Sequence, residues 1–551
     1  MLETLKKYWG YESFRPLQQE IITSLLEGRD TLAILPTGGG KSVCFQVPAM
    51  MREGICLVIS PLVALMKDQI QNLSRRGIKA LTVHSGMTAR EIDITLDNAI
   101  YGQYKFLYVS PERLQSNLFR TRLQMMDVCM IVVDEAHCIS QWGYDFRPDY
   151  LEIAAIRPIA GENVPIAALT ATATPKVAED IMAKLNFRKP NLIRGSFVRP
   201  NLSYRFRKAE DKLGKLLEVC NALTGSGIVY ASKRRGTEDL ARFLQSQSIS
   251  ADCYHAGMDR ARRNEVQDAW MRGDVRIIVA TNAFGMGIDK PDVRFVCHYD
   301  MPSTLEGYFQ EAGRAGRDGE QAWAVLLWND SDVRRLRQIV RTTFPPLEYI
   351  RDIYQKVFQY LNIAYEEGKG TSRKFVIEEF ARHYRLNAAT AYSAVKYIEQ
   401  SGYWTLTEEM DIPSKLNFRI SRDALYRIQL SNYGLDTFIK VLMRTYTGLF
   451  SGYVPIDEER IARNGHYAVD VVRERLEYLA RRDIVNYIPG FKASLLHLTL
   501  ERLTEDNLRL PQSEYRERIE RHTSHLEAMI SVAQAPDSER VPMMLSYFGE
   551  E

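Results

Sequence analysis

The sequence lacks the features of membrane proteins and of secreted, disulfide-bonded proteins. No apolar run among its 551 residues approaches the roughly 18 to 20 residues that cross a bilayer, so we expect no membrane association. The N-terminus has neither an apolar core nor a small-residue cleavage site, which argues against a secretory signal. The seven cysteines form no Cys-x-x-Cys pair and fit neither a disulfide framework nor a zinc ribbon. We therefore predict reduced thiols in a bacterial cytoplasm, or in the nucleus of a eukaryote.

The sequence also lacks a large excess of charge of one sign. It has 72 Lys and Arg against 69 Asp and Glu, a net charge of +3. Any site for a polyanion must therefore be a local groove, because no strongly basic tail exists. The composition, 45% hydrophobic and 26% charged, is that of a globular protein. At about one domain per 100 to 200 residues, three or four domains are expected.

Short apolar runs alternate with turns and amphipathic stretches in the first 345 residues. In residues 1–205 these runs lie at Thr31–Leu35, Cys56–Ser60, Ala80–Val83, Phe106–Val109, Met130–Val133 and Ile166–Leu169. A second series lies at Gly227–Tyr230, Ser250–Tyr254, Val275–Ala280, Arg294–His298 and Ala322–Leu327. This alternation is typical of a doubly wound parallel sheet. We predict two α/β lobes in tandem, residues 1–205 and 206–345, joined by an extended connector at Phe197–Leu202.

Beyond residue 345 the pattern becomes mostly helical. Two segments look like a helix-turn-helix followed by a β-hairpin, which predicts winged-helix-like units in residues 346–430 and 431–510. Generic helical packing is the alternative. The predicted hairpins pair Tyr403–Thr407 with Leu416–Ile420, and Ile484–Ile488 with Ser494–Leu500. Residues 511–551 are expected to form a C-terminal helical segment.

A glycine-rich turn follows the first predicted strand. It reads Pro36-Thr37-Gly38-Gly39-Gly40-Lys41-Ser42. Glycines let successive backbone N–H groups surround a phosphate at a helix N-terminus. Lys41 can then reach the β- and γ-phosphates, and Ser42 can ligate Mg²⁺. The strict phosphate-loop pattern has a glycine where this sequence has Leu35, and a glycine-rich turn alone does not distinguish a phosphate site from an ordinary turn.

A second strand supplies acidic residues. Met130–Val133 is followed by Asp134, Glu135, Ala136 and His137. An acid at the end of a parallel strand beside the phosphate loop can hold magnesium, and its neighbour can activate water for in-line attack. The co-occurrence of the two motifs predicts a site for NTP hydrolysis, with Asp134 as a magnesium ligand beside Ser42.

Two arginines lie in the second lobe within Gln310–Arg317. Arg314 and Arg317 are three residues apart, which would place them on one face of a helix. Directed across a lobe interface, their guanidinium groups could neutralise the γ-phosphate in the transition state. Two such arginines more often lie on a solvent-exposed helix face. Because they occur in the same chain as the glycine-rich turn and the Asp134–His137 motif, we predict that they act as arginine fingers.

These motifs, in this order, resemble those of superfamily 2 helicases, and the surrounding residues resemble the RecQ family from about residue 5 to residue 340. The resemblance implies two RecA-like lobes and an ATP-dependent DNA helicase that moves 3′ to 5′ on single-stranded DNA. It also implies unwinding of duplex DNA in repair and recombination, with ATP and Mg²⁺ as cofactors. Partners are expected among single-stranded-DNA-binding and repair proteins.

The segment Gly10–Gln18 resembles the family's adenine-binding segment. By this resemblance Tyr11 and Arg15 would sandwich the adenine ring, and Gln18 would hydrogen-bond its edge. Leu17 stands where the family usually has glycine.

Three further stretches match motifs of the family: Ser60–Gln69, Leu169–Ala173 and Ala280–Pro291. Their hydroxyl, ammonium and backbone N–H groups suit sequence-independent contacts to phosphates. The residues assigned to DNA contact or coupling in these stretches are Ser60, Lys67, Thr170 and Thr281.

The stretch Cys138–Pro148 resembles the family's aromatic-rich loop. Trp142 and Phe146 offer stacking faces worth roughly 1 to 3 kcal/mol per base, and Arg147 can bind a phosphate or face the ATP side. We predict that this loop reports strand occupancy to the hydrolysis site. Without the neighbouring motif, an aromatic cluster would more often be core. Tyr144 stands where many members carry histidine.

The resemblance is weaker in the C-terminal half of the chain. Family members often follow the second lobe with a helical zinc module and one winged helix, whereas here winged-helix-like units follow at once. The end, Met543–Glu551, resembles the lead-in to that module's cysteine cluster. No cysteine follows Cys297, so either the chain stops before a zinc site or this member lacks one. We predict no bound zinc.

The sequence as a whole predicts an ATP-driven DNA helicase. One alternative is an RNA helicase, or a translocase that does not separate strands. Another is a winged-helix DNA-binding protein in which ATP acts as a switch. We also predict that the turn at Pro489–Lys492 wedges the duplex. The residues do not fix the oligomeric state or the preferred DNA structure; a monomer is favoured.

Overall fold

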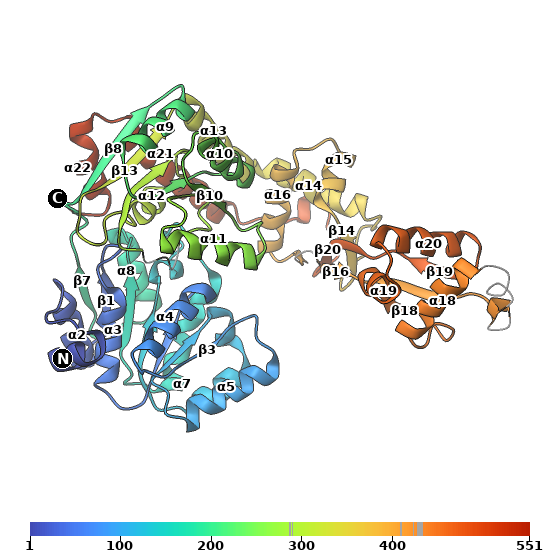
Figure 1. Cartoon of the computed structure of the whole chain (residues 1–551), viewed down its shortest axis with the longest axis horizontal. Helices are drawn as coiled ribbons and strands as arrows, with labels where there is room; N and C mark the ends of the chain where they lie inside the picture. Colours follow the sequence, from blue (N-terminus) through green and yellow to red (C-terminus); the bar gives the residue numbers. More distant parts are fainter. Residues whose placement is uncertain (286–287, 289, 408–409, 422–423, 427–432, 551) are drawn as a thin grey trace. The chain divides into compact units, whose positions relative to one another are not determined.

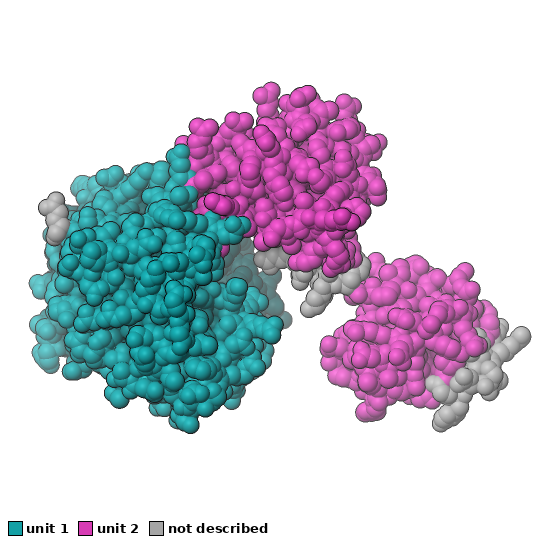
Figure 2. Space-filling view, turned by 90° about the horizontal axis from the view of Figure 1, so that it is seen from above, with its two compact units in different colours: residues 1–338, 520–551 teal, residues 339–519 magenta. Residues whose placement is uncertain are grey.

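The computed structural model describes residues 1–551 except 286–287, 289, 408–409, 422–423, 427–432 and 551 (Figure 1). Contacts divide these residues into two units, residues 1–338 with 520–551, and residues 339–519 (Figure 2). The first unit holds two α/β lobes and the end of the chain. Among the described residues, no helix is both long and apolar enough to cross a membrane.

The first lobe is built on a seven-stranded parallel sheet in the order β3-β4-β2-β5-β6-β1-β7. Its strands are β1 (Thr31–Ile34), β2 (Ile55–Ile59), β3 (Ala80–Val83), β4 (Phe106–Val109), β5 (Val128–Val133), β6 (Ile166–Thr170) and β7 (Asn191–Arg194). On β5, Ile131 and Val133 enter the core on one face, and Met130 and Val132 enter the core on the other. Because both faces are buried, the strand is a continuous apolar run.

Helices cover both faces of this sheet. One face is covered by α2 (Gln18–Leu26), α3 (Lys41–Met50) and α4 (Val63–Arg75). The other is covered by α5 (Ala89–Tyr101), α6 (Asn117–Leu123), α7 (Ile153–Ala160) and α8 (Pro175–Lys184). The remaining elements are α1 (Leu2–Trp9) and three 3₁₀ turns, η1 (Pro111–Gln115), η2 (Ala136–Ile139) and η3 (Pro148–Glu152).

The second lobe is a six-stranded parallel sheet in the order β10-β11-β9-β12-β13-β8. Its strands are β8 (Leu202–Lys208), β9 (Ser226–Tyr230), β10 (Ala251–Tyr254), β11 (Ile277–Ala280), β12 (Val293–His298) and β13 (Ala322–Trp328). Its helices are α9 (Lys212–Ala222), α10 (Arg234–Ser246), α11 (Arg260–Arg272), α12 (Leu305–Ala312) and α13 (Asp330–Thr343).

The predicted fold class, two tandem RecA-like parallel-sheet lobes before a mostly helical region with winged-helix-like units, is confirmed. Among the strands of the two lobes, the apolar pattern misses β7 and β8, each at one edge of its sheet. Both carry exposed or half-buried polar residues because one side of an edge strand has no partner strand.

The second unit contains two small sheets, each with its own helices. One of these winged-helix-like parts has α14 (Leu347–Tyr360), β14 (Ser372–Phe375), α15 (Ile377–His383), α16 (Ala388–Gln400), β15 (Trp404–Leu406), β16 (Met410–Ile412) and β20 (Phe491–Leu498). The other has β17 (Ser414–Phe418), α18 (Tyr433–Thr445), β18 (Val454–Ile456), α19 (Glu458–Gly465), α20 (Val469–Arg481) and β19 (Val485–Ile488).

The strand pairing of these sheets differs from the prediction. Strand β20 pairs with β14, β15 and β16, whereas β17 pairs with β18 and β19. The hairpins predicted for Tyr403–Thr407 with Leu416–Ile420, and for Ile484–Ile488 with Ser494–Leu500, are therefore wrong. Apart from residues 422–423 and 427–432, which lie outside the described residues, the segment 414–488 has a sheet and a core of its own and is inserted in the sequence between β16 and β20.

Burial of matching apolar faces explains this pairing. Trp404 and Leu496 lie in one core with Ile398, whereas Leu416 and Val485 lie in another. Each strand therefore completes the core of its own helices. The turn at Pro489–Gly490 consequently connects two different sheets instead of closing a hairpin, and a role of this turn as a wedge stays a prediction. The side chains of residues 491 and 492 lie outside the described part of the chain.

The chain returns to the lobes at its end. After η4 (Glu505–Asn507) come α21 (Gln512–Gln534) and α22 (Asp537–Tyr547). Phe548 is fully buried in the first lobe's core and stacks on Phe197 of the connector, with ring centroids 4.6 Å apart. Tyr547 donates a hydrogen bond to the Glu306 carboxylate of α12 at 2.7 Å. The last residues thus contact the connector and the second lobe.

Candidate functional site

The glycine-rich turn forms the link between β1 and α3. Gly38 and Gly40 have φ values of +82° and +75°, the left-handed region that glycine favours, and α3 begins at Lys41. A Cβ on Gly40 would overlap the amide nitrogen of Gln18. The turn therefore requires glycine at this position for its backbone conformation and for the close approach of a neighbour.

The segment before α2 lies against this turn. The Arg15 guanidinium donates to the Gly38 carbonyl, and the Gln18 amide donates to the Gly40 carbonyl at 3.1 Å. Gln18 also accepts from the Arg15 backbone N–H at 2.9 Å and is buried. Tyr11 is 49% exposed. Leu17, where the family usually has glycine, adopts a left-handed conformation with φ +66°.

A cavity of about 340 Å³ lies beside the glycine-rich turn, between the two lobes. It is lined by Arg15, Pro16, Leu17, Leu35, Pro36, Thr37, Gly38, Gly39, Gly195, Ser196, Arg199, Asn201, Gly316, Arg317 and Gly319. Part of this lining comes from the two segments that the sequence predicts for nucleotide binding, and Gly195, Ser196, Arg199 and Asn201 come from the chain between the lobes. The second-lobe part comes from the arginine-containing motif.

Asp134 and Glu135 follow the end of β5. Asp134 accepts from the Ser60 hydroxyl at 3.3 Å and from the Glu135 backbone N–H at 3.0 Å. Desolvation and the Glu135 charge raise the pKa of Asp134 to about 6, whereas the nearby Lys41 charge acts in the opposite direction. Glu135 is in the left-handed region with φ +47°, and its Oε2 has no hydrogen-bond partner among the described residues. A strained acid with an unsatisfied oxygen is typical of an active site.

His137 connects these acids to the next strand. Its Nδ1 lies 2.9 Å from the Thr170 hydroxyl at the end of β6 and 3.5 Å from Glu135 Oε2. Burial lowers the pKa of His137, so the ring is neutral near pH 7. Thr170 is itself buried and also bonds to the Thr172 backbone.

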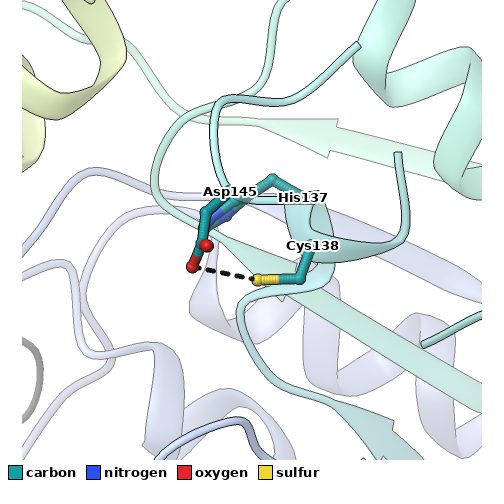
Figure 3. A group of neighbouring side chains, drawn as sticks. All are labelled: His137, Cys138 and Asp145. Atoms are coloured by element: carbon teal, nitrogen blue, oxygen red, sulfur yellow. Dashed lines mark hydrogen bonds between the residues drawn. The ribbon is translucent and has the colours of Figure 1, made fainter. Parts of the chain in front are cut away.

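The base of the aromatic-rich loop is closed by polar contacts (Figure 3). The Cys138 thiol donates to Asp145 Oδ2 at 3.8 Å, and Arg147 donates to the same oxygen at 3.1 Å. Potential metal-ligating atoms of His137, Cys138 and Asp145 lie within 4.8 Å of one another. Burial raises the pKa of the Cys138 thiol and Asp145 is already paired, so this set fits a closed loop better than a metal site.

Two cations lie close to the Trp142 ring. The Lys176 ammonium lies 2.9 Å from its ring centroid, and the Arg521 guanidinium of α21 lies 4.5 Å from it. Arg521 also donates to the Gln141 carbonyl. Phe146 is half-buried, with the Lys184 ammonium 5.8 Å from its ring centroid. A base that stacks on Trp142 would compete with these cations for the ring.

The two arginines of the second lobe do not share a helix face, which contradicts the prediction. Helix α12 ends at Ala312, and Gly313 and Gly316 turn the chain, the latter with φ +63°. Arg314 is buried and donates to the Gly285 carbonyl within its own lobe. Arg317 lines the cavity, with its Cγ 3.2 Å from the position of a Cβ on Gly38.

The other motif residues divide between the lobes. Ser60 and Thr170 contact Asp134 and His137 and are buried. Lys67 is half-buried on α4, and Thr281 follows β11 in the second lobe. Residues 286, 287 and 289 of the predicted motif Ala280–Pro291 lie outside the described residues.

Comparison with known proteins matches the same segments. Family models match residues 15–181 (DEAD/DEAH box helicase), 209–319 (helicase conserved C-terminal domain) and 416–489 (RecQ helicase winged-helix domain, Bacteroidota). The probable ATP-dependent DNA helicase RecS of Bacillus subtilis is 41% identical over 356 residues, 64% of this chain and 71% of that protein. The chain belongs to the RecQ family of helicases.

Another similar protein is the ATP-dependent DNA helicase RecQ of Haemophilus influenzae, 44% identical over 340 residues. This RecQ-family chain has 62% of its length in that match but spans only 55% of the H. influenzae protein. Among solved structures, Saccharomyces cerevisiae Dbp5 bound to RNA and ADP BeF₃ has a TM-score of 0.50 at 18% identity, over 62% of this chain and 90% of that one. This likeness shows the fold of the two lobes alone.

The RecQ winged-helix model coincides with the inserted unit, β17 to β19, and leaves the surrounding unit unmatched. Sequence reasoning also missed Arg199 of the connector. Arg199 donates to the carbonyls of Gly313 at 3.2 Å and Ala315 at 3.0 Å, and it lines the cavity. A basic residue in the short connector between the two lobes was a signal that could have identified Arg199 as a site residue. The sequence pattern of the connector indicated only an extended segment between the lobes.

Proposed function

We propose that this chain is an ATP-dependent DNA helicase that moves 3′ to 5′ on single-stranded DNA and unwinds duplex DNA in repair and recombination. The observation that carries the proposal is the direct connection of the aromatic-rich loop to the DEAH residues through the contacts of His137, Cys138 and Asp145. Membership of the RecQ family and the names of the similar proteins, which include ATP-dependent DNA helicases, support the choice of DNA.

The donor groups of the glycine-rich turn and its neighbouring segments fit a magnesium nucleotide. Backbone N–H groups of Gly38 to Gly40 and the Lys41 ammonium suit phosphate oxygens, and Tyr11, Arg15 and Gln18 are assigned to the adenine side. Ser42 and Asp134 offer the oxygen ligands that Mg²⁺ prefers. Bound Mg²⁺ would supply charge neutralisation between the phosphates.

The protein's own residues would then perform three tasks. Glu135 orients the attacking water, for which its unsatisfied Oε2 is available. Arg317 neutralises charge at the transferred phosphate when the lobes close, while Arg314 holds its motif to Gly285. Trp142, Phe146 and Arg147 contact the DNA strand. Further contacts to the strand come from Ser60, Lys67, Thr170 and Thr281, or from residues beside them. Single-stranded-DNA-binding and repair proteins remain the protein partners that the family resemblance implies.

Steady-state ATP hydrolysis tests this function. The rate is measured with Mg²⁺, with and without single-stranded DNA or RNA, for the wild type, Lys41→Ala, Trp142→Ala and the control Tyr101→Ala. Tyr101 is 74% exposed on α5 and should behave as wild type. We expect strong stimulation by DNA, no hydrolysis in Lys41→Ala, and an apparent DNA affinity about tenfold weaker in Trp142→Ala.

Other outcomes identify other functions. Stimulation by RNA instead of DNA would indicate an RNA helicase. Hydrolysis that ignores both nucleic acids would contradict the helicase and favour a nucleotide switch on a DNA-binding protein. Stimulation by DNA without strand separation would indicate a translocase.

A further inference from the structure

One residue of the aromatic-rich loop contacts both the DEAH motif and the second lobe. The Tyr144 ring stacks on the His137 ring, with centroids 4.8 Å apart and planes 18° apart. Its hydroxyl donates to Gln310 Oε1 on α12 at 2.7 Å. Tyr144 and Gln310 are 166 residues apart in the chain.

The stacked side of Tyr144 leads to the hydrolysis residues. His137 is 2% exposed, so its ring has little freedom to move away from Tyr144. The same ring lies 3.5 Å from Glu135 Oε2 and 2.9 Å from the Thr170 hydroxyl. A change in the position of Tyr144 therefore changes the surroundings of Glu135 through one intervening side chain.

The Tyr144 hydroxyl reaches the second lobe through Gln310, while the Thr172 side chain of the first lobe also lies within its reach. Desolvation raises the pKa of Tyr144 well above its usual range, so the hydroxyl keeps its proton and acts as the donor to Gln310. Gln310 is buried on α12, and the turn after this helix brings Gly313 against Thr37 of the glycine-rich turn. The Tyr144–Gln310 hydrogen bond can form only when α12 lies against the first lobe.

We propose that Tyr144 is a positioning residue that couples closure of the lobes to the placement of His137 and Glu135. Closure supplies the Gln310 acceptor, the hydrogen bond fixes the Tyr144 ring, and the ring holds His137 beside Glu135. Tyr144 belongs to the aromatic-rich loop, which is assigned to contact with the DNA strand. Binding of the strand and closure of the lobes therefore both affect the position of the Tyr144 ring. The part of this proposal that links lobe closure to ATP hydrolysis rests on the proposed function. The part that assigns the Tyr144–Gln310 hydrogen bond a contribution to lobe closure does not.

Four variants separate the hydroxyl from the ring. Tyr144→Phe keeps the stack and removes the hydrogen bond, Gln310→Ala removes the acceptor, and the double variant combines both. Tyr144→His keeps an aromatic ring with an N–H donor. The control Tyr403→Phe loses a hydroxyl of the second unit that bonds to the Arg509 backbone at 2.8 Å.

The first measurement is lobe closure by fluorescence energy transfer, which needs no hydrolysis. Dyes are placed on Tyr101→Cys and Leu213→Cys, exposed sites in the two lobes. Cys253→Ser removes the one cysteine that is not buried. With the non-hydrolysable analogue AMP-PNP, the ratio of closed to open molecules should fall about three- to tenfold in Tyr144→Phe and be restored in Tyr144→His.

The second measurement is DNA-stimulated hydrolysis at saturating DNA. We expect kcat of Tyr144→Phe to fall about fivefold, with the ATP KM and the affinity for labelled oligo(dT) within about twofold of wild type. Gln310→Ala should add less than about twofold to Tyr144→Phe, because both remove the same bond. Tyr403→Phe should match the wild type.

Two results would overturn the proposal. One is an unchanged closure ratio and kcat in Tyr144→Phe; the other is full additivity of Tyr144→Phe and Gln310→Ala. A loss of closure in Tyr144→Phe, in a protein whose hydrolysis ignores DNA, would instead overturn the proposed function and leave the closure contact in place.

Discussion

At the residue scale, the acids of the DEAH segment combine desolvation with close negative charge. Asp134 has a pKa near 6 because its carboxylate is removed from water and lies beside Glu135. Its ionised form is needed to ligate a cation, so protonation competes with Mg²⁺. The sequence predicted both acids from their place after a buried strand. It could not predict the rise in pKa, which arises from burial of the carboxylate at the end of β5 and from the Glu135 charge, against the opposing charge of Lys41.

Mg²⁺ affinity should therefore depend on pH around the pKa of Asp134. Above about pH 6 the carboxylate is ionised and the affinity is constant; below it, the apparent affinity falls about tenfold per pH unit. Isothermal titration of the nucleotide-bound protein with Mg²⁺ between pH 5 and 8 measures this. In Asp134→Asn the affinity should be low throughout and lose the dependence. Equal pH profiles for the two proteins would contradict the assignment of Asp134 as a ligand.

A second residue-scale prediction concerns the glycine-rich turn. Gly40→Ala places a Cβ where φ is +75° and where the Gln18 amide already lies, so both the turn and its support must shift. The matched control is Gly77→Ala, at φ +74° with nothing within 4 Å. Both variants should lose about 1 to 2 kcal/mol of stability from backbone strain.

Only Gly40→Ala should also bind nucleotide weakly. We expect its Kd for a fluorescent ATP analogue to rise at least about tenfold, while Gly77→Ala binds as wild type. Thermal unfolding and fluorescence titration measure the two effects separately. Nucleotide affinity that falls equally in both variants would show that strain alone, not the fit of the turn to a phosphate, is responsible.

At the element scale, segments distant in the sequence complete local structures. The sequence predicted the strands of the lobes other than β7 and β8 because their apolar pattern is local. It mispaired the strands after residue 400 because the pattern shows which face is apolar but not which distant strand covers it. Strand β20 lies more than eighty residues after β15 and yet pairs with it, Trp404 opposite Leu498.

Removal of the inserted unit should leave the surrounding unit folded. Ile412 pairs with Phe491, so residues 413–490 can be replaced by a short Asn-Gly turn that joins β16 directly to β20. In the full chain with this deletion, thermal unfolding should stay cooperative and the lobes should keep DNA-stimulated hydrolysis. Aggregation or loss of cooperative unfolding would contradict the independence of the two sheets.

The contact of α21 with the aromatic-rich loop makes another prediction. Arg521 covers Trp142, and this cation–π contact is worth about 1 kcal/mol. If a base replaces Arg521 on the ring, Arg521→Ala should bind oligo(dT) about fivefold more tightly. Arg516→Ala removes an exposed charge of the same helix and should bind no more tightly than wild type. Weaker binding by Arg521→Ala alone would show that Arg521 contacts the strand instead.

At the scale of the whole molecule, the two lobes together carry the residues assigned to nucleotide binding and those assigned to contact with the DNA strand. The order of the motifs along the chain predicted the family, the fold of the lobes and the phosphate turn, because each depends on neighbours in sequence. The return of the chain end to the connector, where Phe548 stacks on Phe197, was not predictable, since nothing local marks the partner of a single aromatic residue. The same holds for Tyr144 and Gln310.

Strand displacement tests the central claim most directly. A labelled duplex with a 3′ single-stranded tail and one with a 5′ tail are each mixed with the full chain, ATP and Mg²⁺. Release of the labelled strand is then followed for the wild type and for Lys41→Ala. The account predicts ATP-dependent separation of the 3′-tailed duplex by the wild type and none by Lys41→Ala. It would be contradicted if the wild type bound the substrate and hydrolysed ATP without separating the strands, or separated only the 5′-tailed duplex.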